Sequence, residues 1–234
     1  MRGLLQRAKR IYQTEGLAQP LRRAPAGFTY CLFERRTYVL VDHATENIRH
    51  MDTADLMPRA EDCSLKIVST NAEADELETQ GLEFRSQISN ARERLGKEAA
   101  AFVVFVGGEF ASIAWVAMSQ EAVETLSEPP VRTDFTKGEA LCGAVLTKQE
   151  HRRKRLNLYM GLHIRQFLLD RGIATMRGAI GKDNAASLKA NDRFRPTVYA
   201  EGRYLRILRW KSWKERPLST SEQEAVRQSD EPHS

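Results

Sequence analysis

Four consecutive cations occupy the stretch from Arg152 to Arg155, between an apolar segment and a helical pattern. The apolar segment, Glu139 to Thr147, predicts a strand, and the apolar spacing over Leu156 to Leu169 predicts a helix. The first turn of a helix presents unpaired amide groups and a partial positive charge. Cations are normally unfavourable there, so a bound anion would explain why they gather at this end. The pattern indicates a pyrophosphate site, with a solvated basic loop as the alternative.

The elements that would position this turn form a strand, a helix and a second strand. Gly172 predicts the end of the helix, and Ile173 to Ile180 predicts the second strand. Together the three elements predict a right-handed βαβ crossover from Glu139 to Ile180. A short helix is expected to follow over Asn184 to Arg193.

Three segments of the chain together resemble the GNAT superfamily of N-acetyltransferases. Val145 to Asn157 resembles the family's strand, phosphate-binding loop and helix start, with Arg152 at the family's Arg/Gln position. Asp183 to Phe194 is similar to the later family segment that carries an Asn and a Ser three residues apart, here Asn184 and Ser187. Phe102 to Val116 is similar to the family's central hairpin. The resemblance covers about residues 28 to 213.

The resemblance implies a fold class and an activity. The fold would be α/β (α+β), with a mixed, mostly antiparallel central sheet, a βαβ crossover and flanking helices. The activity would be direct transfer of an acyl group from acyl-CoA, with acetyl-CoA as the expected co-substrate, to an amine acceptor. The amine must be neutral to attack, so a base or a water chain should remove its proton.

The resemblance also implies which residues hold the donor. The backbone near Val145 and Leu146 would hold the thioester, and a gap between this strand and the next would admit the pantetheine arm. The residues implied in donor binding are Val145, Leu146, Arg152, Arg153, Lys154, Arg155, Leu156, Asn157, Asn184 and Ser187.

Acid and base candidates lie close to the loop in the sequence. Glu139, at the start of the strand before the loop, is the candidate base, with a surface carboxylate as the alternative. His151 is a weaker candidate base and is expected to help the anion site. Tyr159, on the helix after the loop, is the candidate acid, with a buried core tyrosine as the alternative. Tyr199 and Tyr204 have the same two interpretations, a candidate acid or a buried core tyrosine.

Several positions depart from the family pattern. Arg155 and Asn157 stand where the family has its two loop glycines, and Asn191 stands where it often has a tyrosine. These departures motivate a second hypothesis, a GNAT-shaped binding module without catalysis. It would dock on an anionic membrane or on nucleic acid through the basic N-terminus and the cations from Arg152 to Arg155. For the enzyme we expect no nucleic-acid partner, and residues 1–25 are a candidate contact with a membrane surface.

Composition sets wider bounds on function. The net charge of +5 suits an anionic partner, but a plain basic surface explains it as well. The three cysteines, Cys31, Cys63 and Cys142, match no metal or disulfide pattern, so we expect reduced thiols, no metal and a cytoplasmic protein. No apolar run is long enough to cross a bilayer.

The chain is expected to divide into three parts: a basic helical appendage over residues 1–27, the acyltransferase-like domain over 28–215, and a disordered polar tail over 216–234. Within the domain the patterns predict one long helix and several further strands. The helix is Glu73 to Leu95, and the strands are Phe28 to Phe33, Arg36 to Val41, Leu65 to Val68, Ala100 to Val106, Phe110 to Met118 and Val198 to Trp210. The last of these is either one long strand or two short ones around Gly202. Glu34-Arg35 and Gly107-Gly108 are the expected turns.

Overall fold

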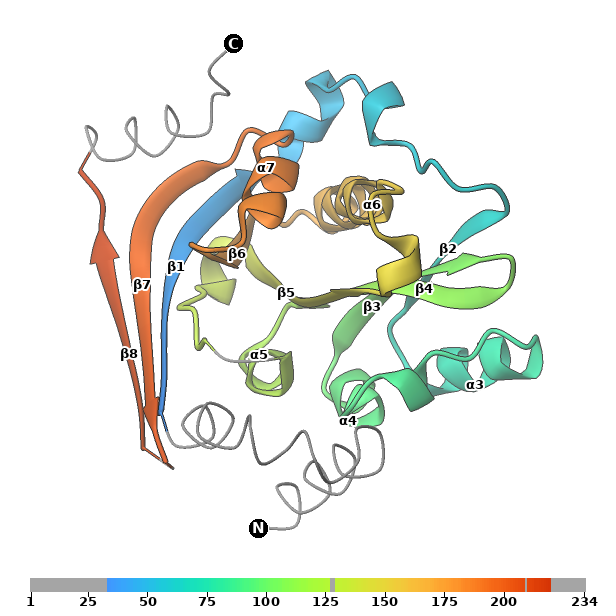
Figure 1. Cartoon of the computed structure of the whole chain (residues 1–234), viewed down its shortest axis with the longest axis horizontal. Helices are drawn as coiled ribbons and strands as arrows, with labels where there is room; N and C mark the ends of the chain where they lie inside the picture. Colours follow the sequence, from blue (N-terminus) through green and yellow to red (C-terminus); the bar gives the residue numbers. More distant parts are fainter. Residues whose placement is uncertain (1–32, 127–128, 209, 220–234) are drawn as a thin grey trace, which may run out of the picture.

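The computed structural model describes residues 33–126, 129–208 and 210–219, and these form one eight-stranded sheet with helices on both faces (Figure 1). The strands are β1 (Phe33–Ala44), β2 (Cys63–Val68), β3 (Ala99–Val106), β4 (Glu109–Ala117), β5 (Glu139–Thr147), β6 (Thr175–Gly181), β7 (Thr197–Ile207) and β8 (Trp210–Pro217). Their order across the sheet is β2-β3-β4-β5-β6-β1-β7-β8. β5 and β6 pair in parallel, and the other neighbours pair antiparallel. The predicted fold class is confirmed.

Helices cover the two faces of the sheet in separate groups. The α-helices are α3 (Asn71–Thr79), α4 (Ala91–Gly96), α5 (Gln120–Leu126), α6 (Leu156–Asp170) and α7 (Ala185–Asp192). Short 3₁₀ helices are η1 (Thr45–His50), η2 (Ala54–Leu56), η3 (Arg85–Gln87), η4 (Phe135–Lys137) and η5 (Gln149–His151). In Figure 1, α6 and α7 lie above the sheet, and α3, α4 and α5 lie below it. None of the helices in the described part of the chain is long and apolar enough to cross a membrane.

Three buried clusters hold these layers together, and alternation along β3 and β4 divides the two largest. Phe102 and Ala114 point to the cluster under α6, whereas Val103 and Trp115 point to the cluster over α3 to α5. All of these side chains are at most 1 % exposed, so β3 and β4 are covered on both faces. The predicted hairpin is confirmed. Gly107 and Gly108 both have positive φ, as a tight hairpin turn requires.

The predicted crossover is confirmed as a strand, a helix and a parallel strand. β5 has the predicted bounds, and α6 extends the predicted helix by one residue. Gly172, with φ of 71°, follows the end of α6, and Ile173 N donates to Leu168 O. That is the hydrogen bond by which a left-handed glycine closes a helix.

Two predictions about the first half of the chain are wrong. The expected helix from Glu73 to Leu95 is broken at Gly81, whose φ is 80°, and the amide of Leu82 caps α3 by donating to Leu77 O. The expected turn at Glu34-Arg35 is absent, because both residues lie inside β1 and pair with β7. A long antiparallel partner therefore outweighed the local charge pattern.

Parts of the prediction fall outside the described residues. These are the appendage over residues 1–27, the stretch 28–32 with Cys31, and residues 220–234 of the predicted tail. At the other boundary, β8 includes Arg216 and Pro217, two positions assigned to the tail. The next residue is also tied to the sheet, because Leu218 N donates to Tyr199 O.

Candidate functional site

β5 and β6 pair at their first residues and then separate. The last pair is Leu141 with Arg177. Beyond it β5 stays paired with β4 as far as Thr147, and β6 stays paired with β1 as far as Gly181. The two strands therefore leave the middle of the sheet open while each keeps its outer partner.

A bulge in β5 bends the strand at this opening. Trp115 of β4 faces Gly143, and Ile113 faces Leu146, so one residue of β4 lies opposite Ala144 and Val145 together. Ala144 has φ of 49°, a conformation that residues other than glycine rarely adopt. A bulge of this kind re-aims the strand and leaves groups unpaired. Val145, just after it, is 48 % exposed.

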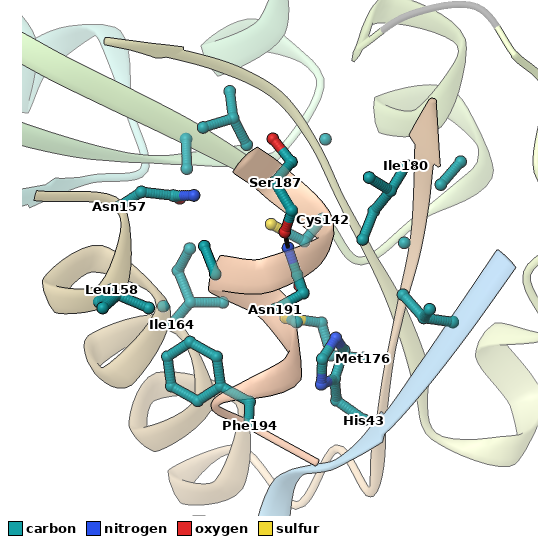
Figure 2. A pocket seen from close by; sticks show the side chains of 18 of the residues that line it. His43, Cys142, Asn157, Leu158, Ile164, Met176, Ile180, Ser187, Asn191 and Phe194 are labelled. Atoms are coloured by element: carbon teal, nitrogen blue, oxygen red, sulfur yellow. Dashed lines mark hydrogen bonds between the residues drawn. The ribbon is translucent and has the colours of Figure 1, made fainter. Parts of the chain in front are cut away.

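A cavity of about 240 Å³ occupies the opening on the α6 and α7 side of the sheet (Figure 2). Its walls come from β1, β4, β5, β6, α6 and α7, together with Asn184 just before α7 and Phe194 just after it. In Figure 2, Asn157 of α6 and Ser187 and Asn191 of α7 converge on the same space, with His43 of β1 at its side. The lining residues are Val41, His43, Ala114, Cys142, Gly143, Ala144, Val145, Asn157, Leu158, Gly161, Ile164, Arg165, Met176, Gly178, Ala179, Ile180, Gly181, Asn184, Ser187, Ala190, Asn191 and Phe194.

The first turn of α6 opens beside this cavity. No described side chain caps the helix, and its first internal hydrogen bond at this end runs from Tyr159 N to Arg155 O. The amides of Leu156, Asn157 and Leu158 precede that bond. Because uncapped amides at a helix start carry partial positive charge, this corner favours an anion. Asn157 and Leu158 also line the cavity, which connects the corner to the open sheet.

Arg155 takes the backbone conformation that a glycine would take at this position. Its φ is 60°, and its side chain turns to Asp55 of η2, with Nη1 3.4 Å from Oδ1. The guanidinium of Arg155 is therefore engaged with η2, and the residue is not among those that line the cavity. The left-handed backbone costs a residue with a Cβ about 1 kcal/mol.

A pair of variants would measure this strain. Arg155→Gly and Arg155→Ala both remove the ion pair with the exposed Asp55, so they differ only in the Cβ. We expect the glycine variant to be more stable than the alanine variant by about 1 kcal/mol, measured by urea denaturation. Equal midpoints would contradict a left-handed residue at this position.

The Asn and Ser of the later segment are placed by helix capping. Asn184 is the N-cap of α7, and its Oδ1 accepts from Ser187 N at 3.1 Å. Asn191 Nδ2 in turn donates to Ser187 O at 3.0 Å, the dashed line in Figure 2. The spacing of three residues therefore orders the first turn of α7, which forms one wall of the cavity.

The structure brings together four of the predicted donor-binding residues. Val145, Asn157, Asn184 and Ser187 all line the cavity. Leu146 lies next to the lining and is 43 % exposed, and its carbonyl accepts from Ser112 Oγ. Leu156 is buried in the core under α6. The loop cations Arg152, Arg153, Lys154 and Arg155 lie at the start of α6 but outside the lining.

The two predicted acid and base residues lie elsewhere. The ring of Tyr159 packs edge-on against His163, with ring centroids 4.6 Å apart, and it is not among the lining residues. Glu139 lies in β5 before the strands separate. Its Oε1 is 3.1 Å from Arg177 Nη2, and its Oε2 accepts from Asp134 N.

Arg177 ties Glu139 to a polar cluster on the face of the sheet opposite α6. Its Nε lies 3.2 Å from Asp42 Oδ1, and the guanidinium stacks on the ring of Tyr199 at 4.9 Å from its centroid. Burial raises the pKa of Asp42, and the charge of Arg177 opposes that rise. This cluster lies beneath the closed end of the opening, where Leu141 and Arg177 form the last pair.

Sequence reasoning missed the deep end of the cavity. His43 is 1 % exposed and Arg165 is 2 % exposed, and both line it. Arg165 interrupts an otherwise apolar buried face of α6 formed by Met160, Ile164 and Leu168. A charged residue at a core-facing position was the available signal. The sequence around His43 carries no comparable signal, because only the strand order of the folded sheet brings β1 beside β6.

The chain is similar to known proteins in structure only. No protein-family model matches the chain, and no curated protein matches it in sequence. Among the described residues, no group of three His, Cys, Asp or Glu side chains is placed to hold a metal ion.

Several solved structures are similar to this chain. The match to a Drosophila protein covers 81% of this chain and 58% of the Drosophila chain, with 9% sequence identity and a TM-score of 0.50. The match to a tandem GNAT protein from the clavulanic acid biosynthesis pathway covers 88% of this chain and 62% of that protein's chain, with 17% sequence identity and a TM-score of 0.47. The match to a GCN5-related N-acetyltransferase-like protein from Streptococcus suis covers 92% of this chain and 76% of that protein's chain, with 14% sequence identity and a TM-score of 0.46.

These similarities concern the fold alone. The chain spans about three fifths of the length of the Drosophila structure and of the tandem protein. Its own topology contains a parallel pair that opens beside a helix start, within a mostly antiparallel sheet. The architecture agrees with the expected fold class, a mixed and mostly antiparallel sheet with a βαβ crossover, and the Drosophila structure shares this fold at a TM-score of 0.50.

Proposed function

We propose that the chain is an acyl-CoA-dependent N-acyltransferase that binds acetyl-CoA, or a related acyl-CoA, in the opening between β5 and β6. One observation carries the proposal. The two strands separate after Leu141 and Arg177, and the uncapped first turn of α6 stands at the same opening. A thioester arm with a diphosphate at one end needs both features, a slot in the sheet and an anion site at its mouth.

The residues present fit such a co-substrate. The amides of Leu156, Asn157 and Leu158 would hold the diphosphate. The wall from β6 carries Gly178, and the absence of a side chain there lets an extended arm approach the backbone. The opposite wall, from Cys142 to Val145, offers the backbone groups that face β6 after the two strands separate, and the bulge at Ala144 and Val145 leaves further groups unpaired.

The reaction would be a direct transfer. The lone pair of a neutral amine attacks the thioester carbonyl carbon, the carbon–sulfur bond breaks, and the products are an amide and the free thiol of CoA. One amine proton must leave, and the thiolate must gain one. Glu139 lies beneath the closed end of the opening but outside the cavity lining, so we assign it proton acceptance through a water chain rather than by direct contact. We assign no role to Tyr159, because its ring packs outside the cavity.

Asn157→Asp tests the diphosphate site. The change keeps the size of the side chain and adds a negative charge in the first turn of α6. A helix start favours an acidic residue by about 0.5 kcal/mol, so the variant should melt at the same temperature or slightly higher. A bound diphosphate should be repelled, and we expect the Kd for acetyl-CoA, measured by titration calorimetry, to rise on the order of 10-fold.

A matched control is Asn90→Asp, the same substitution at an exposed position before α4, and it should leave the affinity unchanged. The proposal fails if the native chain binds no acyl-CoA at millimolar concentration. If it binds acetyl-CoA but releases no free thiol with any amine offered, the binding part stands and the catalytic part falls.

A further inference from the structure

Arg165 is a buried cation, and one edge of its guanidinium is unpaired among the residues that the structure describes. It lies on α6, is 2 % exposed and lines the cavity. Nη1 donates to Gly161 O at 2.8 Å, and the guanidinium stacks 3.7 Å from the centroid of the Phe194 ring. Nε and Nη2 have no hydrogen-bond partner in the described part of the chain.

The groups around Arg165 do not compensate its charge. It forms no ion pair with a described carboxylate, and its polar neighbours are His43 and Cys142. Burial, followed by the charge of Arg165, lowers the pKa of His43, so the imidazole is neutral at pH 7. Burial raises the pKa of the Cys142 thiol to about 11, so it is neutral as well.

Arg165 itself stays charged at pH 7. Burial lowers its pKa to about 9, which leaves the guanidinium protonated under physiological conditions. An uncompensated charge with two unpaired donors is costly inside a protein, and such groups are normally paired. Stacking on Phe194 and one hydrogen bond to the carbonyl of Gly161 compensate only part of the cost of burying the guanidinium. The arrangement therefore points to an anion that the cavity receives.

The free edge has the shape of a carboxylate site. Nε–H and Nη2–H are parallel donors on one side of the guanidinium, and a carboxylate accepts from such a pair through both of its oxygens. His43, which also lines the cavity, is close enough to interact electrostatically with the guanidinium. Neither of its ring nitrogens reaches hydrogen-bond geometry with a described residue, although Asn191 and the backbone of Phe194 are near.

The place of Arg165 along α6 decides which part of a ligand it meets. α6 starts at the mouth of the opening and runs back along β5 toward its closed end. Arg165 lies eight residues after Asn157, a rise of about 12 Å along the helix axis. There it interacts with Cys142, the first residue of β5 beyond the last strand pair. A donor with its diphosphate at the mouth would bring its acyl end to this depth.

We infer that the free edge of Arg165 receives a carboxylate at the far end of the acyl group, so that the preferred donor is the CoA thioester of a dicarboxylic acid. The inference rests on the proposed function, because it places a CoA thioester in the opening. It adds the chemical class of the acyl group.

Two donors of equal chain length test the inference. Succinyl-CoA and butyryl-CoA both carry four-carbon acyl groups, and only the first ends in a carboxylate. We expect the native chain to bind succinyl-CoA on the order of 30-fold more tightly, measured by titration calorimetry, because a buried charge pair is lost with the other donor. This comparison needs no variant, so it does not depend on how a substitution folds.

Arg165→Met and Arg171→Met form a matched pair of variants. Arg171 lies just beyond the same helix, donates to Phe167 O and stacks 3.5 Å from the Phe167 ring centroid, but it is exposed and does not line the cavity. We expect Arg165→Met to abolish the preference for succinyl-CoA while it still binds butyryl-CoA. Arg171→Met should keep the preference. Arg165→Lys, which retains the charge, should keep part of it.

The outcomes separate the two proposals. If no donor binds, the proposed function fails. If the native chain binds acetyl-CoA but shows no preference for succinyl-CoA over butyryl-CoA, the inference about Arg165 is overturned and the proposed function stands. If free succinate binds through Arg165 in the presence of CoA while succinyl-CoA has no advantage, the carboxylate belongs to another ligand, and the assignment to the donor is wrong.

Discussion

Gly161→Leu is expected to weaken acetyl-CoA binding on the order of 100-fold, while the protein stays folded. Gly161 lines the cavity from α6, and an added Cβ would lie 2.9 Å from Phe194 Cζ and 3.1 Å from Arg165 Nη1. A larger side chain must therefore displace the stacked pair or occupy the cavity. Replacing glycine inside a helix gains about 1 kcal/mol of helix propensity, which offsets part of the crowding.

Titration calorimetry with acetyl-CoA and a thermal melt measure the two effects separately. Gly96→Leu is the control, since a Cβ there meets nothing closer than Asn71 Nδ2 at 3.9 Å, on the other side of the sheet. Gly161→Ala should fall between the native chain and the leucine variant. If Gly161→Leu binds acetyl-CoA with the native affinity, the donor lies outside this cavity.

Arg177→Met is expected to destabilise the protein by about 3 kcal/mol at about pH 7.5, which corresponds to roughly 10 °C in Tm. Arg177 is the shared partner of Asp42 and Glu139, and the carboxylate of Glu139 is 11 % exposed. Removing the guanidinium leaves two carboxylates close together without a cation. The measurement is urea denaturation followed by circular dichroism.

The loss should shrink as the pH falls. Burial already raises the pKa of Asp42, and removal of the opposing charge of Arg177 should raise it further. A carboxyl group whose pKa is higher in the folded state favours folding at low pH, and that contribution is lost as the pH rises through the folded pKa. At about pH 5 the variant should therefore recover part of the lost stability. A loss that is independent of pH would contradict the burial of an unpaired carboxylate.

Two further variants give this prediction its controls. Arg203→Met removes an exposed partner of Glu201, and it should change stability by less than about 0.5 kcal/mol. Glu139→Gln keeps an oxygen that can accept from Asp134 N but removes the charge beside Arg177. It should cost less stability than Arg177→Met. If Glu139 accepts the amine proton, this variant should also release thiol more slowly while its affinity for acetyl-CoA is unchanged.

The sequence by itself determined the local elements around the candidate site. β5 could be predicted with its bounds, and α6 to within one residue, because apolar spacing and Gly172 act over a few neighbouring residues. The segment with Asn184 and Ser187 could be recognised for the same reason, since a helix cap involves residues three positions apart. The crossover followed, because few connections join a strand, a helix and a second strand.

Only the tertiary structure decided what lies inside the opening. The placement of β1 between β6 and β7 brings His43 beside Met176, and pairing with strands more than a hundred residues away has no local signal. The bulge at Ala144 arises from the register between β4 and β5, which depends on both strands at once. Arg165 could be read as a charge on a helix, but its burial without a described carboxylate beside it depends on α7, β1 and β5 meeting around it. Long-range packing therefore set the chemistry at the deep end, because the groups that desolvate a side chain come from distant parts of the chain.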